Sequence, residues 1–287
     1  MIVARGVTEL KEILKEWRRR GDSIAFVPTM GNLHDGHLRL VEVGRAQANR
    51  VVVSIFVNPT QFCEGEDFDV YPRTPEQDLE KLRSAKADLA FLPATEAIYP
   101  HGRDGMSFVE VPGLSEQLCG RFRPGHFRGV ATIVCKLFHL VQPDIALFGE
   151  KDYQQLTVIR KMVTDLDFPV RIEGVPTVRE ANGLAMSSRN AYLSPAEKDR
   201  AAMIYHTLLR AVAAIQDGER DYPALEERAR EELQTVGFGV DYVSIRRQQD
   251  LAPPSATDRE LVILAAARLG GTRLIDNIPF LVANEAL

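Results

Sequence analysis

One stretch, Ser23–His37, constrains the fold most strongly. It contains a short apolar segment, then a loop with a glycine, then the expected start of a helix. Ile24–Pro28 (IAFVP) is predicted to be a buried strand, and the loop Thr29–Leu33 follows it. His34 and His37 lie where the next helix is expected to begin. The first N–H groups of a helix have no partner within it, and the helix dipole is positive there. This order of elements therefore predicts an anion-binding site, and two imidazoles at that position suggest phosphate.

Strands and helices alternate through about the first 175 residues of the chain. Val51–Val57 (VVVSIFV) is β-branched and almost wholly apolar, which is typical of a strand covered on both faces. The other expected strands are Ile24–Pro28, Leu89–Leu92, Met106–Val111, Ile145–Phe148 and Val170–Val175. The expected helices run from Thr8 to Gly21, from Thr74 to about Lys86, over Val130–Val141 after a loop at Arg123–Gly129, and from Asp152 to Leu166. This pattern predicts an α/β fold with a Rossmann-like, doubly wound parallel sheet, which binds ligands beyond the carboxyl ends of its strands.

The character of the sequence changes near Pro176, which divides the chain into expected domains 1–176 and 177–287. After a polar connection, Ser194 begins a helix with a capping box and proline at the first position, and this helix continues to about Gln216. A second helix, Tyr222–Val236, and three strands are expected to follow, at Val240–Ile245, Leu261–Ala267 and Thr272–Ile275. Helices followed by strands predict a smaller α+β domain with an antiparallel sheet.

Composition and charge indicate which classes of binding partner to expect. The net charge is −5 and no basic block stands out, so we expect no nucleic acid as a partner. No apolar run approaches the ~20 residues that span a bilayer, and glutamates interrupt the N-terminal segment where a secretory signal would be apolar. Three cysteines without a CxxC pair predict unpaired buried thiols in a reducing cytoplasm. The protein is therefore expected to be cytoplasmic, with small-molecule ligands.

Three further polar clusters follow expected strands or lie near the domain junction. Asn58 and Gln61 come after Val51–Val57, and their amides suit recognition of hydroxyl and carboxylate groups, although turn formation would also explain Asn58. Lys151, at a strand-to-helix junction, can meet phosphates, and Gln155 is expected on the same face one turn later. Two serines and an arginine in Met186–Arg189 form a plausible phosphate clamp, although such a short motif also occurs by chance.

The two histidines admit more than one interpretation. A pair three residues apart can serve an ordinary structural purpose, or can chelate a metal from one helical turn. No HExxH motif or Cys–His cluster completes a zinc site, so their position after a glycine loop favours phosphate.

Six sequence blocks, in this order and at these spacings, carry a resemblance to a known family: FVPTMGNLHDGH, VVSIFVNP-QF, YPRT, RPGHFRGV, FGEKDYQQL and GLAMSSRN. Together they resemble the pantoate–β-alanine ligase (pantothenate synthetase) family, from Ile24 to about Asn277. The H-x-G-H motif and the Met186–Arg189 loop are also similar to those of nucleotidyltransferases and class I aminoacyl-tRNA synthetases. Thr60 departs from the family pattern, where methionine is common, and so does Asn182, where aspartate is common.

The resemblance implies a reaction and a role for each matching residue. Pantoate would attack the α-phosphorus of ATP to give pantoyl adenylate and pyrophosphate, and β-alanine would then displace AMP to give pantothenate. His37, His34, Lys151 and Arg189 would be the catalytic residues. Gln61 and Gln155 would bind pantoate, with Gln61 also near β-alanine. ATP would be bound by Met30, Gly31, Asn32, Leu33, His34, Asp35, Gly36, His37, Gly149, Glu150, Lys151, Asp152, Val178, Met186, Ser187, Ser188 and Arg189.

The resemblance also implies Mg²⁺ accompanying ATP, with Asp78 as a candidate ligand, a homodimer, and a C-terminal domain that acts as a lid. Two other hypotheses remain open. One is a nucleotidyltransferase that stops after transferring a nucleotidyl group, which the H-x-G-H motif alone permits. The other is a nucleotide-sensing or metal-binding module without catalytic activity.

Overall fold

The computed structural model describes residues 1–282 and divides into two compact units. Unit 1 comprises residues 1–150 and 155–176, and unit 2 comprises residues 151–154 and 177–282 of the described chain. The segment Lys151–Gln154 therefore packs with unit 2, although the residues on both sides of it belong to unit 1.

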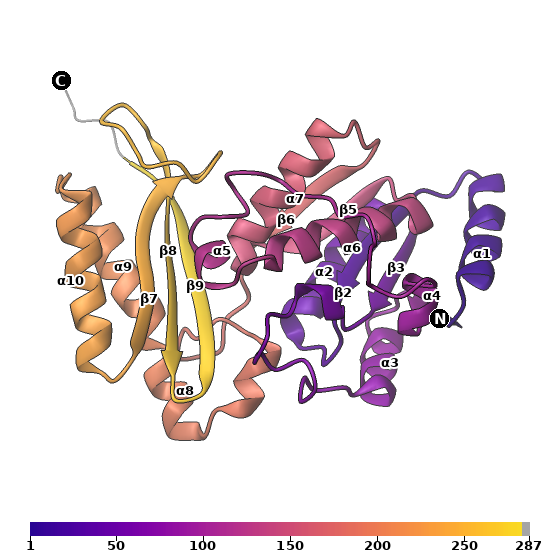
Figure 1. The fold of residues 1–287 in the computed structure, drawn as a ribbon, viewed down its shortest axis with the longest axis horizontal. Helices are drawn as coiled ribbons and strands as arrows, with labels where there is room; N and C mark the ends of the chain where they lie inside the picture. Colours follow the sequence, from indigo (N-terminus) through magenta and orange to yellow (C-terminus); the bar gives the residue numbers. More distant parts are fainter. Residues whose placement is uncertain (283–287) are drawn as a thin grey trace. The chain divides into compact units, whose positions relative to one another are not determined.

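Unit 1 is built on a six-stranded parallel sheet with the strand order β1-β4-β3-β2-β5-β6. Figure 1 labels β2, β3, β5 and β6 of this sheet. Its strands are β1 (Ile2–Ala4), β2 (Ile24–Thr29), β3 (Arg50–Ile55), β4 (Leu89–Phe91), β5 (Ile145–Gly149) and β6 (Arg171–Val175). Its helices are α1 (Val7–Arg19), α2 (Asp35–Gln47), α3 (Pro75–Ser84), α4 (Thr95–Ile98), α5 (Cys119–Phe122) and α6 (His126–Val141), with a 3-10 turn η1 (Pro59–Gln61). The 3-10 turn η2 (Glu150–Asp152) and helix α7 (Tyr153–Asp165) also belong to unit 1, except for their residues 151–154. β3 and β4 follow β2 in the chain and lie on one side of it, whereas β5 and β6 lie on the other side. Strand order therefore reverses between the neighbours β2 and β5.

Alternate residues of β2 pack on opposite faces of the sheet. Ala25 and Val27 join the cluster that contains Leu40 and Val41 of α2. Phe26 points the other way and meets Phe138 of α6 edge-on, with ring centroids 6.4 Å apart. Because both faces are covered, β2 carries no polar side chain except Thr29 at its carboxyl end.

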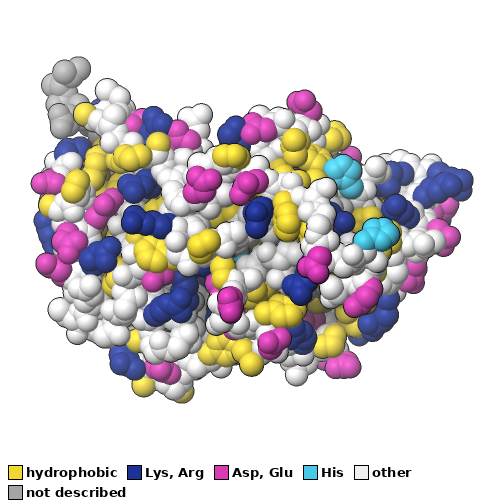
Figure 2. Space-filling view, in the orientation of Figure 1, with side chains coloured by type: hydrophobic (Ala, Val, Ile, Leu, Met, Phe, Trp, Pro, Cys, Tyr) yellow, Lys and Arg dark blue, Asp and Glu magenta, His cyan; other side chains and the backbone are white. Residues whose placement is uncertain are grey.

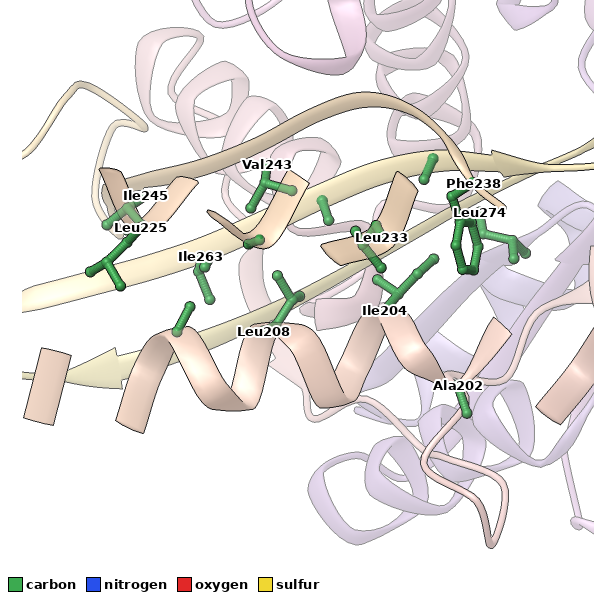
Figure 3. Close-up of a cluster of buried hydrophobic side chains, with 14 of the residues drawn as sticks. Ala202, Ile204, Leu208, Leu225, Leu233, Phe238, Val243, Ile245, Ile263 and Leu274 are labelled. Atoms are coloured by element: carbon green, nitrogen blue, oxygen red, sulfur yellow. The ribbon is translucent and has the colours of Figure 1, made fainter. Parts of the chain in front are cut away.

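Unit 2 is an antiparallel three-stranded sheet with three helices. The sheet has the order β7 (Gly239–Arg247), β8 (Glu260–Leu269) and β9 (Thr272–Leu281). The helices are α8 (Pro195–Ala201), α9 (Met203–Gln216) and α10 (Tyr222–Thr235), preceded by a 3-10 turn η3 (Ser188–Tyr192). Figure 3 shows Leu208 of α9, Leu233 of α10 and Ile263 of β8 within one buried apolar cluster.

Several sequence predictions of local structure need correction. Met106–Val111 forms no strand; the backbone N–H of Val109 donates instead to the hydroxyl of Thr132. The expected loop Arg123–Gly129 becomes helical from His126 onward, because Gly125 adopts a left-handed conformation that begins α6. Helix α1 begins at Val7 with Gly6 rather than Thr8 as its N-cap.

Two other helix starts can be compared with the sequence. Thr74 occupies the N-cap position of α3 but makes no capping hydrogen bond with its side chain. The expected helix from Ser194 to Gln216 is two helices, interrupted at Ala202, although the predicted capping box between Ser194 and Glu197 is confirmed.

The cysteine prediction is correct only in part. No disulfide joins the three cysteines in the described chain, but only Cys119 is buried, and Cys63 and Cys135 are partly exposed. Figure 2 shows basic and acidic side chains interspersed over the visible face. Among the described residues, no helix combines the length and apolar character needed to cross a membrane.

Candidate functional site

The loop after β2 is held in shape by the carboxylate of Asp78. Oδ2 of Asp78 accepts the backbone N–H of Asn32, and Oδ1 accepts that of Leu33, both at 2.8 Å. One turn along α3, the ammonium of Lys81 donates to the backbone oxygen of Leu33 at 2.5 Å. Gly31 has φ +84° and lies so close to Asp78 that a Cβ would come within 3.1 Å of its carboxylate. Asp78 is fully buried and anchors this loop, a use that the sequence did not predict for it.

His34 and His37 lie together at the amino end of α2. His34 is the N-cap residue, and its backbone N–H donates to Nδ1 of His37 at 3.3 Å. The two rings are 4.1 Å apart between centroids. Because Nδ1 of His37 is an acceptor, the proton of the neutral ring is on Nε2. His37 is thus arranged to donate from Nε2, next to a helix end whose dipole favours anions.

The amide of Gln61 is oriented by two neighbours. Asn58 Nδ2 donates to Gln61 Oε1 at 3.0 Å, and Gln61 Nε2 contacts the sulfur of Met30 at 3.1 Å. Asn58 Oδ1 in turn accepts hydrogen bonds from the hydroxyls of Tyr99, at 2.7 Å, and Thr60, at 3.0 Å. The structure therefore brings Met30, from the first sequence cluster, into contact with Gln61 from the second.

Helix α6 packs against η1 with unusually close backbone contact. A Cβ on Gly129 would lie 2.2 Å from the backbone oxygen of Thr60 and 2.7 Å from Cα of Gln61. The backbone oxygen of Gly129 also accepts from Asn58 Nδ2 at 3.3 Å. The RPGHFRGV block thus supports the segment that carries Gln61, a task that sequence reasoning left unassigned.

The carboxyl end of β5 lies at the point where strand order reverses, beside the carboxyl end of β2. This is where open parallel sheets bind ligands. Gly149 ends β5 and Glu150 follows it, and burial raises the pKa of the Glu150 carboxyl above its ordinary value, with Arg160 opposing the shift. Gln155 is half-buried on α7 within the same unit.

Lys151 and Asp152 belong to unit 2, where their side chains form an ion pair at 3.6 Å. Lys151 lies in the 3-10 turn η2, ahead of α7. That Gln155 and Lys151 share one face stays a prediction, because the two residues belong to different units.

The Met186–Arg189 segment closes a hairpin-like connection in unit 2. The backbone N–H of Met186 donates to Val178 at 3.0 Å, and the hydroxyl of Ser187 accepts the N–H of Arg189 at 3.3 Å. The side-chain oxygen of Asn182 accepts from Leu184 at 3.1 Å, as expected of a turn-forming residue. Val178 and the phosphate-clamp candidates are therefore brought together locally.

The base of this connection is fixed by Arg179. Its guanidinium pairs with both oxygens of Asp276, at 2.7 and 2.9 Å, and lies 3.7 Å from the ring centroid of Tyr205. Bidentate pairing and stacking of this kind restrict the orientation of the guanidinium. No local pattern in the sequence indicates this anchor.

No cluster of three or more histidine, cysteine, aspartate or glutamate side chains within residues 1–282 is arranged to hold a metal ion. Within that range, His34 and His37 are therefore not joined by the further protein ligands of a closed zinc site. Mg²⁺ needs no such cluster, because it is usually bound by one or two carboxylates together with substrate phosphates and water.

Comparison with known proteins identifies the family. The family model for pantoate-beta-alanine ligase matches residues 2–279. The chain is 66% identical over 271 residues to pantothenate synthetase of Methylococcus capsulatus, covering 94% of this chain and 95% of that protein. It is 54% identical over 280 residues to pantothenate synthetase of Shewanella loihica, covering 98% and 99%.

Solved structures agree with this comparison and confirm the predicted fold class. Pantothenate synthetase from Thermus thermophilus matches with a TM-score of 0.91 at 45% identity, covering 97% of this chain and 99% of that one. Pantoate-beta-alanine ligase from Francisella tularensis, complexed with beta-gamma ATP and beta-alanine, matches with a TM-score of 0.82 at 33% identity, covering 97% of each. Since the family model spans almost the whole chain and the relatives match over nearly their full length, the chain belongs to the pantoate–β-alanine ligase family.

Proposed function

We propose that this protein condenses (R)-pantoate with β-alanine in a reaction driven by ATP, giving pantothenate, AMP and pyrophosphate. The chain belongs to this family, and the observation that carries the proposal is that unit 1 combines two features. His37 presents a proton donor at the amino end of α2, and the oriented amide of Gln61 touches Met30 of the loop that precedes that helix. The first feature suits a phosphate, and the second suits a small hydroxy acid.

In the first step, the carboxylate of pantoate attacks the α-phosphorus of ATP and pyrophosphate leaves. The carboxylate is already ionised at neutral pH, so the step needs no general base. It needs positioning, and hydrogen-bond donors where negative charge builds up on the phosphate. His37, with its proton on Nε2, and the first N–H groups of α2 supply such donors, with His34 beside them.

Unit 2 supplies the remaining cationic groups in this proposal. Lys151 and Arg189 neutralise phosphate charge, and Ser187 and Ser188 donate hydroxyl hydrogen bonds to the same ATP. Gly149–Asp152 and Val178 bind the nucleotide as the family pattern implies. Residues 177–287 act as a lid that excludes water from the acyl adenylate.

In the second step, the amine of β-alanine attacks the acyl carbon of pantoyl adenylate and AMP leaves with the former carboxylate oxygen. Gln61 and Gln155 hold the pantoyl group, and Gln61 lies near the incoming amine. Mg²⁺, carried on the ATP phosphates, would spread their negative charge. Asp78 remains a candidate magnesium ligand, although its two oxygens each already accept a backbone hydrogen bond. We further propose a cytoplasmic homodimer.

The reaction is tested by incubating the protein with ATP, Mg²⁺, β-alanine and pantoate whose carboxylate is labelled with ¹⁸O. We expect equal amounts of AMP, pyrophosphate and pantothenate, with one ¹⁸O atom transferred to AMP. Folded protein that forms no AMP would refute the ligase, and unlabelled AMP would refute the acyl-adenylate route. A nucleotidyltransferase would instead accumulate an adenylylated product that persists when an amine is added.

A further inference from the structure

Three polar residues beside Gln61 have no part in the proposed reaction. Arg123 donates from Nε and Nη2 to the two carboxylate oxygens of Glu66, at 2.6 and 2.7 Å. Their side chains are only 14% and 20% exposed. A bidentate pair of this kind fixes the plane of the guanidinium, and so fixes where its third nitrogen points.

That third nitrogen meets His126. Nη1 of Arg123 lies 3.0 Å from Nε2 of His126, and Nδ1 of His126 lies 2.7 Å from the backbone oxygen of Gln61. A guanidinium can only donate, so Nε2 of His126 accepts and its ring proton is on Nδ1. Nδ1 then donates to Gln61. His126 is 8% exposed, and its neutral ring has one tautomer that satisfies both neighbours.

Gln61 is thereby held at both ends of the residue. Its backbone oxygen accepts from His126 and, at 3.5 Å, from Nη2 of Arg123. Its side-chain oxygen accepts from Asn58. Because the side chain extends from the backbone that His126 holds, a change at His126 should shift the amide without removing it.

We propose that Glu66, Arg123 and His126 form a positioning relay that sets the Gln61 amide for binding the hydroxy acid substrate. The inference rests on the proposed role of Gln61 in pantoate binding. None of the three relay residues need touch the substrate. If the network served only to fasten α6 to η1, its loss would lower stability without selectively weakening pantoate binding.

The test compares two substitutions of His126. In His126→Asn the side-chain amide nitrogen can take the place of Nδ1 and still donate to Gln61, whereas His126→Ala removes the donor. Arg128→Ala is the matched control, because Arg128 lies on the same helical turn and its side chain stacks on Phe108 at 4.5 Å. Arg123→Lys, which keeps the charge but loses the bidentate geometry, provides a second variant should His126→Ala fail to fold.

Pantoate binding is measured by calorimetry, alongside the KM values for pantoate and ATP and the urea unfolding midpoint. We expect His126→Ala and Arg123→Lys to weaken pantoate binding about tenfold while the KM for ATP changes less than about twofold. His126→Asn should recover most of the lost affinity, and Arg128→Ala should match the wild type. Unchanged pantoate affinity in folded His126→Ala, or equal losses for pantoate and ATP, would overturn the relay.

The calorimetric measurement separates this inference from the proposed function. Wild-type protein that binds pantoate but forms no AMP would refute the ligase, while a selective loss of binding in His126→Ala would still support the relay. Wild-type protein that turns over normally, together with unaltered pantoate binding in His126→Ala, would refute the relay alone.

Discussion

The side-chain amide of Asn277 donates a hydrogen bond to the backbone oxygen of Lys151, over 2.8 Å. Asn277 is a buried residue of β9, and Lys151 follows β5 more than a hundred residues earlier in the chain. Two residues further on, the hydroxyl of Tyr153 donates to the backbone of Gln248 at 3.3 Å. The lysine proposed to bind phosphate is thus held by the C-terminal unit, although it follows a strand of the N-terminal sheet.

Replacing Asn277 with alanine should weaken ATP binding more than it slows turnover. The backbone oxygen of Lys151 would lose its donor, which typically costs about 1 kcal/mol, or about a fivefold rise in the KM for ATP. The KM for pantoate should stay within about twofold of the wild-type value, because only one hydrogen bond, at Lys151, is lost. Asn49→Ala, which removes hydrogen bonds to Ser23 at a remote exposed site, serves as the control. An unchanged KM for ATP in folded Asn277→Ala would show that this bond does not position Lys151.

His37 can be tested by comparing two amides. Asparagine can replace the Nδ1 acceptor that receives the N–H of His34, but it offers no donor at the position of Nε2. Glutamine can reach that position. We expect His37→Asn to lower kcat about a hundredfold, in the range seen for loss of one transition-state donor, and His37→Gln to lower it less. Equal and small losses, with unfolding midpoints like the wild type, would contradict donation from Nε2.

Replacing Asp78 should destabilise the loop after β2. Asp78→Ala leaves the N–H groups of Asn32 and Leu33 without their acceptor, at a cost of about 3 kcal/mol in the free energy of unfolding. Glu76→Ala, on the exposed side of the same helix, should change it by less than about 0.5 kcal/mol. Urea denaturation measures both. A magnesium requirement altered in Asp78→Asn while stability is kept would favour a ligand role instead.

A side chain at Gly129 should disturb η1. A Cβ there would overlap the backbone of Thr60 and Gln61, so Gly129→Ala should lower stability by about 2 kcal/mol or more and weaken pantoate binding. Gly271→Ala is the comparison, because no atom of residues 1–282, its chain neighbours aside, lies within 4 Å of its Cβ position. Thermal unfolding and pantoate titration of the two variants test this, and equal stability of the two would be the contrary result.

The Glu66–Arg123 pair predicts a pH-dependent contribution to stability. Burial opposes ionisation of Glu66, but its hydrogen bond and charge interaction with Arg123 outweigh burial and lower its pKa below the ordinary value of 4.5. Its stabilisation is therefore complete above pH 4.5 and is lost as pH falls through the lowered pKa. We expect Glu66→Gln to be less stable than the wild type at neutral pH, with the difference shrinking below pH 4.5. A difference that stays constant down to about pH 3 would be incompatible with this titration.

Local sequence signals predicted those elements that are formed by local interactions. The apolar run in β2 and the capping box at Ser194 fall within a few residues of their predicted places. Strand β1, by contrast, is three residues long and exists because it pairs with β4, which no local pattern shows. Met106–Val111 carries a strand-like pattern without a partner strand, because Thr132 takes the hydrogen bonds of Val109.

The sequence motifs propose residues for the candidate site, but they do not indicate the residues that support them. The family blocks point to His37, Gln61 and Lys151 by position. His126 lies 65 positions from Gln61, whose backbone it holds, and Asn277 lies 126 positions from Lys151. A hydrogen bond over that separation depends on the folded topology, and one sequence shows no periodicity or spacing that reveals it.

The carboxylate of Asp78 has a consequence for the cost of binding. Ordering the backbone of one residue costs about 1–2 kcal/mol of conformational entropy. Asp78 and Lys81 order Asn32 and Leu33 through contacts within the chain, so that cost is met when the protein folds. A ligand that binds against this loop does not spend interaction energy on ordering the loop. That energy is available to hold the reacting groups in line.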